Sequence, residues 1–322
     1  MRFVITGALG HIGSFLIREL PRAFPDSEIL MVDNLKTNRY CSLFNLPREG
    51  RYRFLEADVL SADLPAVFAG ADVVIHLAAV TDAAASFSNP EEVERVNYRG
   101  TVMVAKASLA AGCSLIHMSS TSVYGTQAQV VDEDCSPEEL QPQSPYAEAK
   151  LKEEAVLREL GNSGSLRFIT LRNGTICGIS PGMRFHTAVN KFCWQAVTGR
   201  PITVWRTALH QKRPYLCLSD AAEAIVYVIR HNLFDGKIYN VLTDNLTVQQ
   251  IIHYIERDIP HTRIEYVDSP IMNQLSYEVS SARFCALGFA FSGKPEESIR
   301  DTISMLAAAG GYGSIEHVRE QR

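Results

Sequence analysis

The chain has 322 residues, of which 46% are hydrophobic and 21% charged, with a formal net charge of -5. This length allows one large or two moderate domains, and mild acidity gives no broad attraction for nucleic acid or an anionic membrane. The seven cysteines are scattered and lack metal-ligand spacing, which predicts reduced thiols. The chain opens with a predicted strand in place of a signal segment and has no long apolar run, so we predict a cytoplasmic protein.

The N-terminal segment has a pattern typical of a dinucleotide-binding turn. Residues 2–5 are rich in β-forming side chains, residues 14–20 have helical spacing, and Gly7, Gly10 and Gly13 stand between them. Such glycines permit a tight turn, close approach of backbone to a pyrophosphate and close packing of helix on strand. We therefore predict that phosphates bind at the start of this helix.

The residue that ends the second predicted strand indicates which dinucleotide binds. The apolar run 29–32 ends in Asp33, 20 residues beyond Gly13 (33 minus 13). An acid here accepts hydrogen bonds from both ribose hydroxyls and repels a 2′-phosphate, which favours NAD over NADP. Arg39 is the nearby residue that would weaken this preference, and an ordinary turn with a surface aspartate is the plain alternative.

Further segments continue the alternation of strands and helices. A strand at 52–55 leads to Asp58, whose carboxylate is placed to meet the adenine amine. The apolar run 73–79 predicts a central parallel strand covered on both faces, ending in small residues that leave room for a cofactor. His76 in this run is better explained as a hydrogen-bonded core histidine than as a catalyst. The alternation predicts an α/β fold, a doubly wound parallel (Rossmann) sheet with right-handed crossovers.

Hydroxyl groups follow the fifth predicted strand. This strand, 114–118, comes after a helix at 90–111 and leads into the segment SSTSVYG at 119–125. Because ligands bind at the carboxyl ends of parallel strands, Ser120 is placed for chemistry.

Tyr146 and Lys150 form the most informative pair. They lie one turn apart in a predicted helix that Ser144 caps, so both can act on one atom. A tyrosine titrates near pH ~10, and a neighbouring positive charge favours its phenolate. The pair alone also fits an ordinary helix with a surface lysine, but the glycine turn, the strand-ending acid and the hydroxyl-rich segment favour catalysis.

Together these motifs resemble the extended short-chain dehydrogenase/reductase family, in its nucleotide-sugar epimerase and dehydratase branch. The matching motifs are TGALGHIG at 6–13, HLAA at 76–79, NYRGT at 97–101, SSTSVYG at 119–125, SPYAEAK at 144–150 and LR at 171–172. The resemblance implies that Tyr146 is the acid/base, that Lys150 lowers its pKa and holds the nicotinamide ribose, and that Ser120 bonds the reacting hydroxyl. Tyr124 would either face the sugar or pack.

The resemblance also implies a set of NAD contacts and a substrate. Asn97 would support the helix and a water near the lysine. The implied cofactor-binding residues are Gly7, Gly10, His11, Ile12, Gly13, Asp33, Asn34, Asp58, Val59, Leu77, Ala78, Ala79, Asn97, Tyr146 and Lys150. The implied substrate-binding residues are Thr81, Ser86, Thr121, Ser122, Thr175, Arg184 and Arg213. The substrate would be a nucleotide sugar.

Two positions after Ser120 bear on the reaction. Dehydratases and decarboxylases of the family carry an acid there, and a fucose-synthase type of epimerase carries a cysteine, whereas this chain has Thr121 and Ser122. This favours 4-epimerisation through a transient keto sugar, which needs only Ser120, Tyr146 and Lys150. A 4-keto reductase or dehydrogenase is the nearest alternative, and an NAD-sensing binding protein without catalysis is an alternative of another class.

The second half departs from the family pattern at several places. Thr175 stands where relatives have Asn, and 268–275 lacks the arginine of an Arg-x-Gly-Asp segment, which leaves the sugar and nucleotide open. Arg213 suits a diphosphate because its fork gives bidentate hydrogen bonds. Arg184 and His186 could reach substrate or could be solvated charges at a helix start.

The chain is expected to divide into two interleaved parts. We predict an NAD-binding domain at 1–177, to which 209–242 returns, and a smaller mixed α/β substrate lobe at 178–322. Asp220 is expected to cap a helix at 221–230, closing helices are expected at 280–287 and 296–306, and 310–322 is expected to be a mobile tail. The resemblance implies a homodimer formed by the helices at about 91–111 and 146–160.

Overall fold

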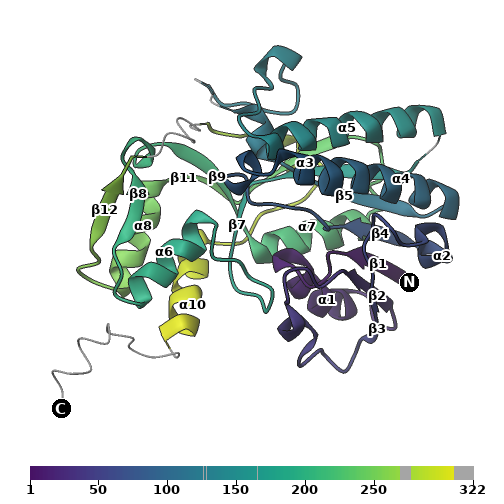
Figure 1. Cartoon of the computed structure of the whole chain (residues 1–322), viewed down its shortest axis with the longest axis horizontal. Coiled ribbons are helices and arrows are strands. Elements are labelled where there is room, and N and C mark those ends of the chain that lie inside the picture. Colours follow the sequence, from purple (N-terminus) through teal and green to yellow (C-terminus); the bar gives the residue numbers. More distant parts are fainter. Residues whose placement is uncertain (126, 128, 165, 269–276, 308–322) are drawn as a thin grey trace.

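A seven-stranded sheet forms the centre of the protein (Figure 1). The structure is a computed structural model that describes residues 1–125, 127, 129–164, 166–268 and 277–307. The strand order is β3-β2-β1-β4-β5-β6-β10, and every neighbouring pair is parallel. These strands are β1 (Arg2–Thr6), β2 (Glu28–Asp33), β3 (Arg51–Glu56), β4 (Val73–His76), β5 (Ser114–Ser120), β6 (Phe168–Asn173) and β10 (Ile238–Val241).

Helices cover both faces of this sheet, as the near-continuous apolar strands predict. Alternate residues point to opposite faces: Phe3 packs in the core beneath α1 and α7, whereas Val4 packs beneath α2, α4 and α5. The predicted doubly wound fold is therefore confirmed. The helices are α1 (His11–Ala23), α2 (Leu64–Phe68), α3 (Pro90–Val93), α4 (Gly100–Ala111), α5 (Pro145–Gly164) and α7 (Leu218–Arg230).

The remaining elements build a second lobe with a core of its own. It contains a three-stranded sheet of order β11-β9-β7 and a pair, β12-β8. Its strands are β7 (Thr175–Cys177), β8 (Ile202–Trp205), β9 (Lys212–Cys217), β11 (Asp244–Thr247) and β12 (Ile264–Val267), and its helices are α6 (Ala188–Val197), α8 (Val248–Asp258) and α10 (Pro295–Ala307). Helix α9 (Ala282–Cys285) packs beside β10.

The chain crosses between the two parts more than once. Within the segment 209–242, α7 packs against α1 and β10 extends the large sheet, whereas β9 belongs to the three-stranded sheet. The division at 177 remains a prediction, and 310–322 lies outside the described residues.

Two local expectations differ from the structure. The helix at 90–111 is interrupted by a π-helical stretch, Glu94–Arg99. Asp220 does not cap α7, whose N-cap is Cys217; it is fully buried and accepts hydrogen bonds from Thr243, Ser292 and Gly293. Short 3-10 helices occur at Tyr40–Leu43, Ala85–Phe87, Thr121–Tyr124, Pro137–Glu139 and Arg206–Ala208.

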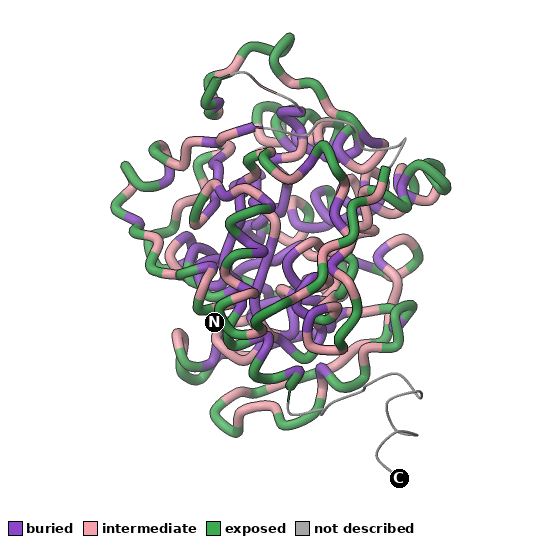
Figure 2. Tube along the Cα trace, turned by 90° about the vertical axis from the view of Figure 1, so that its left-hand side faces the viewer, coloured by how far each residue is buried: buried purple, intermediate pink, exposed green. Residues whose placement is uncertain are grey.

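Buried residues gather along the inner strands and exposed ones on the outer loops (Figure 2). Among the described residues, no helix is long and apolar enough to cross a membrane.

Candidate active site

The turn after β1 contains two glycines that a side chain would disrupt. Gly7 has a φ of +68°, and a Cβ there would lie 2.6 Å from the backbone nitrogen of Ala78. A Cβ on Gly13 would lie 2.6 Å from the carbonyl oxygen of Ala8. Gly10 has more room, its nearest neighbour being 3.2 Å away, and it precedes α1 directly. The turn therefore fits an anion held by backbone N–H groups at a helix N-terminus.

The carboxylate of Asp33 is fixed at the end of β2. Its Oδ2 atom accepts a hydrogen bond from the backbone N–H of Leu9 (3.1 Å), and Oδ1 accepts one from Leu35 (3.0 Å). Burial lowers the pKa of Arg39, and the negative charge of Asp33 opposes this effect, so the two charges lie near each other. This arrangement fits an acid that receives ribose hydroxyls.

Two other predicted cofactor residues contact each other at the neighbouring strand end. Asn34 donates through Nδ2 to Oδ2 of Asp58 (3.0 Å), while Oδ1 of Asp58 accepts from the backbone of Leu60 (2.9 Å). Val59 is buried beside them. The ends of β2 and β3 thus form one polar edge.

A segment of the second lobe is attached to the glycine turn. His11 bonds through Nε2 to the carbonyl oxygen of Gly178 (2.8 Å), Ser180 donates to the carbonyl of His11 (2.9 Å), and Gly182 donates to Ser14 (2.9 Å). Burial lowers the pKa of His11 to about 4, so its ring is neutral at pH 7 and Nε2 is the donor. The side chain of His11 is therefore engaged with the lobe, and we expect any cofactor contact from its backbone.

The helix that carries Tyr146 and Lys150 begins as predicted, because Ser144 accepts a hydrogen bond from the backbone of Ala147 (3.2 Å). Tyr146 is half-buried and Lys150 is buried. The Nζ atom of Lys150 lies 5.9 Å from the centroid of the Tyr146 ring and 2.8 Å from Oε2 of Glu153. The phenol and ammonium thus share one face of α5, as their spacing predicts.

Hydroxyl groups line the end of β5. Oγ of Ser120 accepts from the backbone N–H of Ser122 (3.2 Å) and lies 2.9 Å from Oγ of Ser122. Thr121 is buried and donates to the carbonyl of Asn173 (3.2 Å); its Oγ1 atom also lies 3.5 Å from the hydroxyl of Tyr277. Neither Thr121 nor Ser122 can supply a carboxylic acid.

Tyr124 packs and does not face a sugar. It is fully buried, accepts from Arg172 (2.9 Å) and donates to Asn240 (2.8 Å). Arg172 in turn holds Glu154 through two bonds of 2.9 and 2.7 Å. Glu154 also accepts from Ser119 (2.6 Å), so this buried ion pair fixes the helix α5 on strands β5 and β6.

Positive charge is available from two of the predicted substrate residues. Burial lowers the pKa of Arg184 and the Tyr146 charge opposes this, which places Arg184 near Tyr146. Burial raises the pKa of Tyr277 while the charge of Arg213 lowers it, which places Arg213 near that phenol. Thr175, at the start of β7, is the register partner of Tyr215 in β9.

The remaining predicted residues lie on the segment after β4. Asn97 donates to the carbonyl of Val80 (2.9 Å) and accepts from its N–H (2.7 Å), which ties the segment after β4 to the π-helical stretch, and Ala78 of this segment lies beside Gly7. Ser86 is buried and donates to Ala83 (2.6 Å) within its own turn. Leu77, Ala78, Ala79 and Thr81 on this segment, like Ile12 on α1, are half-buried.

Sequence reasoning missed three residues near this site. Tyr277 follows a segment whose pattern gave no signal. Asp82 affects the pKa values of Arg184 and His186, so it lies close to both, but nothing in its spacing distinguished it from a loop acid. Glu153 resembled an ordinary helix charge. Among the described residues there is no group of His, Cys, Asp or Glu side chains that could hold a metal.

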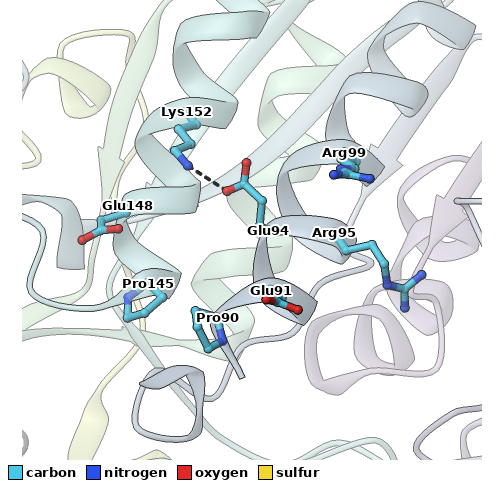
Figure 3. Close-up of a pocket in the computed structure, with 8 residues that line it drawn as sticks. All are labelled: Pro90, Glu91, Glu94, Arg95, Arg99, Pro145, Glu148 and Lys152. Carbon is cyan, nitrogen blue, oxygen red and sulfur yellow. Dashed lines mark hydrogen bonds and ion pairs between the residues drawn. The ribbon is translucent and has the colours of Figure 1, made fainter. Parts of the chain in front are cut away.

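A surface hollow lies apart from these residues, on the outer side of the same helices (Figure 3). Acidic and basic side chains alternate around it, with Lys152 bonded to Glu94 at 2.8 Å. The lining residues are Pro90, Glu91, Glu94, Arg95, Arg99, Pro145, Glu148 and Lys152. This face belongs to the helices that are predicted to pair with a second subunit.

The fold and the site are those of an extended short-chain dehydrogenase/reductase. They combine a doubly wound sheet, a glycine turn with Asp33, and a helix that carries Tyr146 and Lys150 beside the strand that ends in Ser120. The model of the NAD dependent epimerase/dehydratase family matches residues 3–241, and the chain belongs to this family. The NAD dependence of this family confirms the predicted cofactor.

Curated relatives carry several activities. A trifunctional UDP-glucose 4,6-dehydratase/UDP-4-keto-6-deoxy-D-glucose 3,5-epimerase/UDP-4-keto-L-rhamnose-reductase of Arabidopsis thaliana is 30% identical over 93% of this chain and 46% of its own length. The chain thus spans about half the length of the relatives of this kind. A dTDP-D-glucose 4,6-dehydratase of Bos taurus is 28% identical over 94% of this chain and 87% of the relative.

Solved structures of the same fold include a UDP-glucuronic acid 4-epimerase from Bacillus cereus in complex with UDP-glucuronic acid and NAD. It has a TM-score of 0.86 and 22% identity, with 96% of this chain and 100% of that chain covered. A dTDP-glucose 4,6-dehydratase from Streptomyces venezuelae with NAD bound has a TM-score of 0.85 and 20% identity, covering 96% and 97% of the two chains. These likenesses establish the fold.

Proposed function

We propose that the protein is an NAD-dependent nucleotide-sugar 4-epimerase that works through a transient 4-keto sugar. The observation that carries this proposal is the combination of the Tyr146–Lys150 pair with hydroxyls, not acids, at Thr121 and Ser122. Elimination of water from a sugar needs an acid or base at the carbons next to the oxidised one, and these two positions cannot titrate near neutrality.

The protein's own residues would handle the proton and the position of the sugar. Bound NAD supplies the acceptor, and afterwards the donor, of hydride at the sugar carbon. Tyr146 as phenolate would take the proton of the 4-hydroxyl. The keto sugar would then rotate so that its opposite face is toward the nicotinamide, and Tyr146 would return the proton to the oxygen at C4. Lys150 favours the phenolate by its positive charge, and Ser120 bonds the same hydroxyl. No proton or electron is gained or lost over the cycle.

The proposed binding residues follow from placement. NAD would lie along the glycine turn, Asp33 and the residues after β4, at the ends of β1 and β4 where the strand order reverses. Arg184, Arg213 and the hydroxyls of Thr121, Ser122 and Thr175 would receive the nucleotide sugar. The positive charges of Arg184 and Arg213 suit a diphosphate.

The choice of first substrates follows the solved relatives. UDP-glucuronic acid and UDP-glucose come first, because structures of this fold contain them. We also propose that the protein acts as a homodimer in the cytoplasm, paired through the helices of Figure 3.

The test is inversion at C4, followed by NMR of the sugar protons during incubation of the purified protein with UDP-, GDP-, CDP- and dTDP-sugars. We expect inversion of at least one sugar without net change in NADH. Tyr146→Phe should lower kcat on the order of 10²–10⁴-fold, whereas Tyr40→Phe, an exposed tyrosine, should leave it unchanged. Net NADH consumption on a 4-keto sugar without inversion would establish the reductase instead. Cellular function that survives Tyr146→Phe would favour the non-catalytic alternative.

A further inference from the structure

A buried carboxylate beneath the catalytic lysine has no role in the mechanism above. Glu153 is fully buried on α5, and its Oε2 atom lies 2.8 Å from Nζ of Lys150. The same atom accepts from Nε2 of His117 at 2.7 Å and from Oγ1 of Thr101 at 3.1 Å. Donors from three elements, α4, α5 and β5, therefore converge on a single oxygen.

The hydrogen bonds on the α4 side all point toward this oxygen. Because Thr101 donates its one hydroxyl proton to Glu153, it must accept from Nε2 of His76 (3.1 Å). Nδ1 of His76 is then the acceptor for the hydroxyl of Thr6 (2.7 Å). Burial lowers the pKa of His76 to about 3, which agrees with a neutral ring that donates on one side and accepts on the other.

The hydrogen bonds from the β5 side also donate toward Oε2 of Glu153. His117 donates through Nε2 to Glu153, and its Nδ1 lies 3.3 Å from the hydroxyl of Thr170, which can donate to it. Because Oε2 already receives three donors, a protonated carboxylic acid would carry its proton on the buried Oε1, for which the described residues offer no acceptor. Although burial opposes ionisation, Lys150 and His117 lower the pKa of Glu153 to about 2. Glu153 is therefore an ionised carboxylate at which the bonds from both sides end.

We propose that Glu153 is a positioning residue, the counter-ion that keeps the buried ammonium of Lys150 charged and directed at Tyr146. A lysine enclosed by protein without a counter-ion gives up its proton, because burial disfavours the charged form. A neutral lysine would no longer favour the Tyr146 phenolate. The effect on catalysis rests on the proposed function, but the state of Lys150 does not.

The other charges around Lys150 do not replace Glu153. On α5, Tyr146 and Glu154 also raise the pKa of Lys150, but Glu154 is already held by Arg172. From β4 and β5, the facing groups are the two histidines described above, His76 and His117, which supply no negative charge. Burial lowers the pKa of Lys150, and Glu153 is the largest of the influences that raise it above 10.5.

The experiment compares the titration of Lys150 in the wild-type protein and in Glu153→Gln, by NMR of ¹³C-labelled lysine with Lys150→Arg to assign the signal. We expect the variant to lower the pKa of Lys150 by on the order of one unit or more. Above this new pKa, kcat/KM of the variant should fall about tenfold per pH unit, while the wild type keeps its rate. Glu159→Gln removes an exposed carboxylate from the opposite face of α5, outside the hollow of Figure 3, and should change neither readout.

The outcomes separate the two proposals. An unchanged titration of Lys150 in folded Glu153→Gln would overturn the role of Glu153, whatever the enzyme does. If Glu153→Gln does not fold, Glu153→Asp withdraws the carboxylate by one methylene and should lower the pKa of Lys150 in the same direction; no change there would also overturn it. A wild type that inverts no sugar, combined with a lowered Lys150 pKa in the variants, would refute the epimerase and leave the counter-ion in place.

Discussion

The hydroxyl of Tyr277 lies 3.5 Å from Oγ1 of Thr121, in the turn after β5. Thr121 is one of the two positions, with Ser122, at which the family resemblance implies an acid in dehydratases, so a phenol stands beside one of these positions. Burial raises the pKa of Tyr277, and it therefore stays protonated at neutral pH. A neutral phenol can bind a sugar oxygen but is a poor acid or base.

We accordingly expect Tyr277→Phe to raise KM for the nucleotide sugar several-fold, with kcat nearly unchanged. The loss of one hydrogen bond is worth about 0.5–1.5 kcal/mol. Tyr124→Phe is the matched control, because that hydroxyl bonds only within the core to Arg172 and Asn240; it should lower stability and leave KM alone. Steady-state kinetics checks both. A fall of kcat by two orders of magnitude in Tyr277→Phe would mean that this phenol moves a proton.

Asp33→Asn should weaken NAD binding on the order of tenfold and strengthen NADP binding relative to NAD. The substitution keeps the shape but removes the negative charge that receives ribose hydroxyls and repels a 2′-phosphate. Isothermal titration with both dinucleotides measures this. Combining it with Arg39→Gln should cancel the gain for NADP, since Arg39 is the nearby cation. Tighter binding of NADP than of NAD by the wild type would contradict the role of Asp33.

Glu153 should also contribute to acid stability. Its pKa is about 2 in the folded protein against an ordinary 4.5, so its contribution is fully present above pH 4.5 and is lost as the pH falls toward 2. Urea unfolding of wild type and Glu153→Gln should therefore differ most at pH 5–7, on the order of a few kcal/mol, and the difference should shrink by pH 3. A difference that stays constant from pH 7 to pH 3 would contradict an ionised Glu153.

Lys152→Glu should convert the proposed dimer of 35.7 kDa chains into monomers. The hollow of Figure 3 presents both signs of charge on one face, as a self-complementary two-fold interface requires, and reversal places like charges opposite Glu94. Light scattering measures the mass. Arg200→Glu, an exposed change in the other lobe, is the control and should leave the dimer intact. A wild type that is monomeric at all concentrations would exclude the dimer.

The central sheet was predictable because its signals are local. The glycine turn, the acid after the second strand and the apolar runs each depend on neighbours a few residues away, and they agree with one another. Asp220 was misinterpreted for the same reason: an acid before an apolar helix is a cap signal, yet its partners, Thr243, Ser292 and Gly293, are remote in sequence.

The site was predictable only in part. Spacing put Tyr146 and Lys150 on one helix face, but no periodicity distinguishes Glu153, whose partners His117 and Thr101 come from two other elements. The backbone N–H of Tyr277 donates to the carbonyl of Lys212 in β9, and its side chain packs in a cluster with Val123 and Tyr124. Both residues depend on tertiary contacts, which a pattern in one sequence does not contain.

The position of β10 has a consequence for how the chain is made. Strand β6 ends at Asn173, but its outer neighbour, β10, begins only at Ile238. The ribosome therefore synthesises β7, α6, β8 and β9 of the second lobe before β10. Until then the outer edge of β6 carries unpaired backbone groups, the kind of edge that recruits other chains. Nascent protein stalled between these two strands should therefore be the aggregation-prone species, and a chaperone that acts on this chain should act before residue 241 emerges from the ribosome.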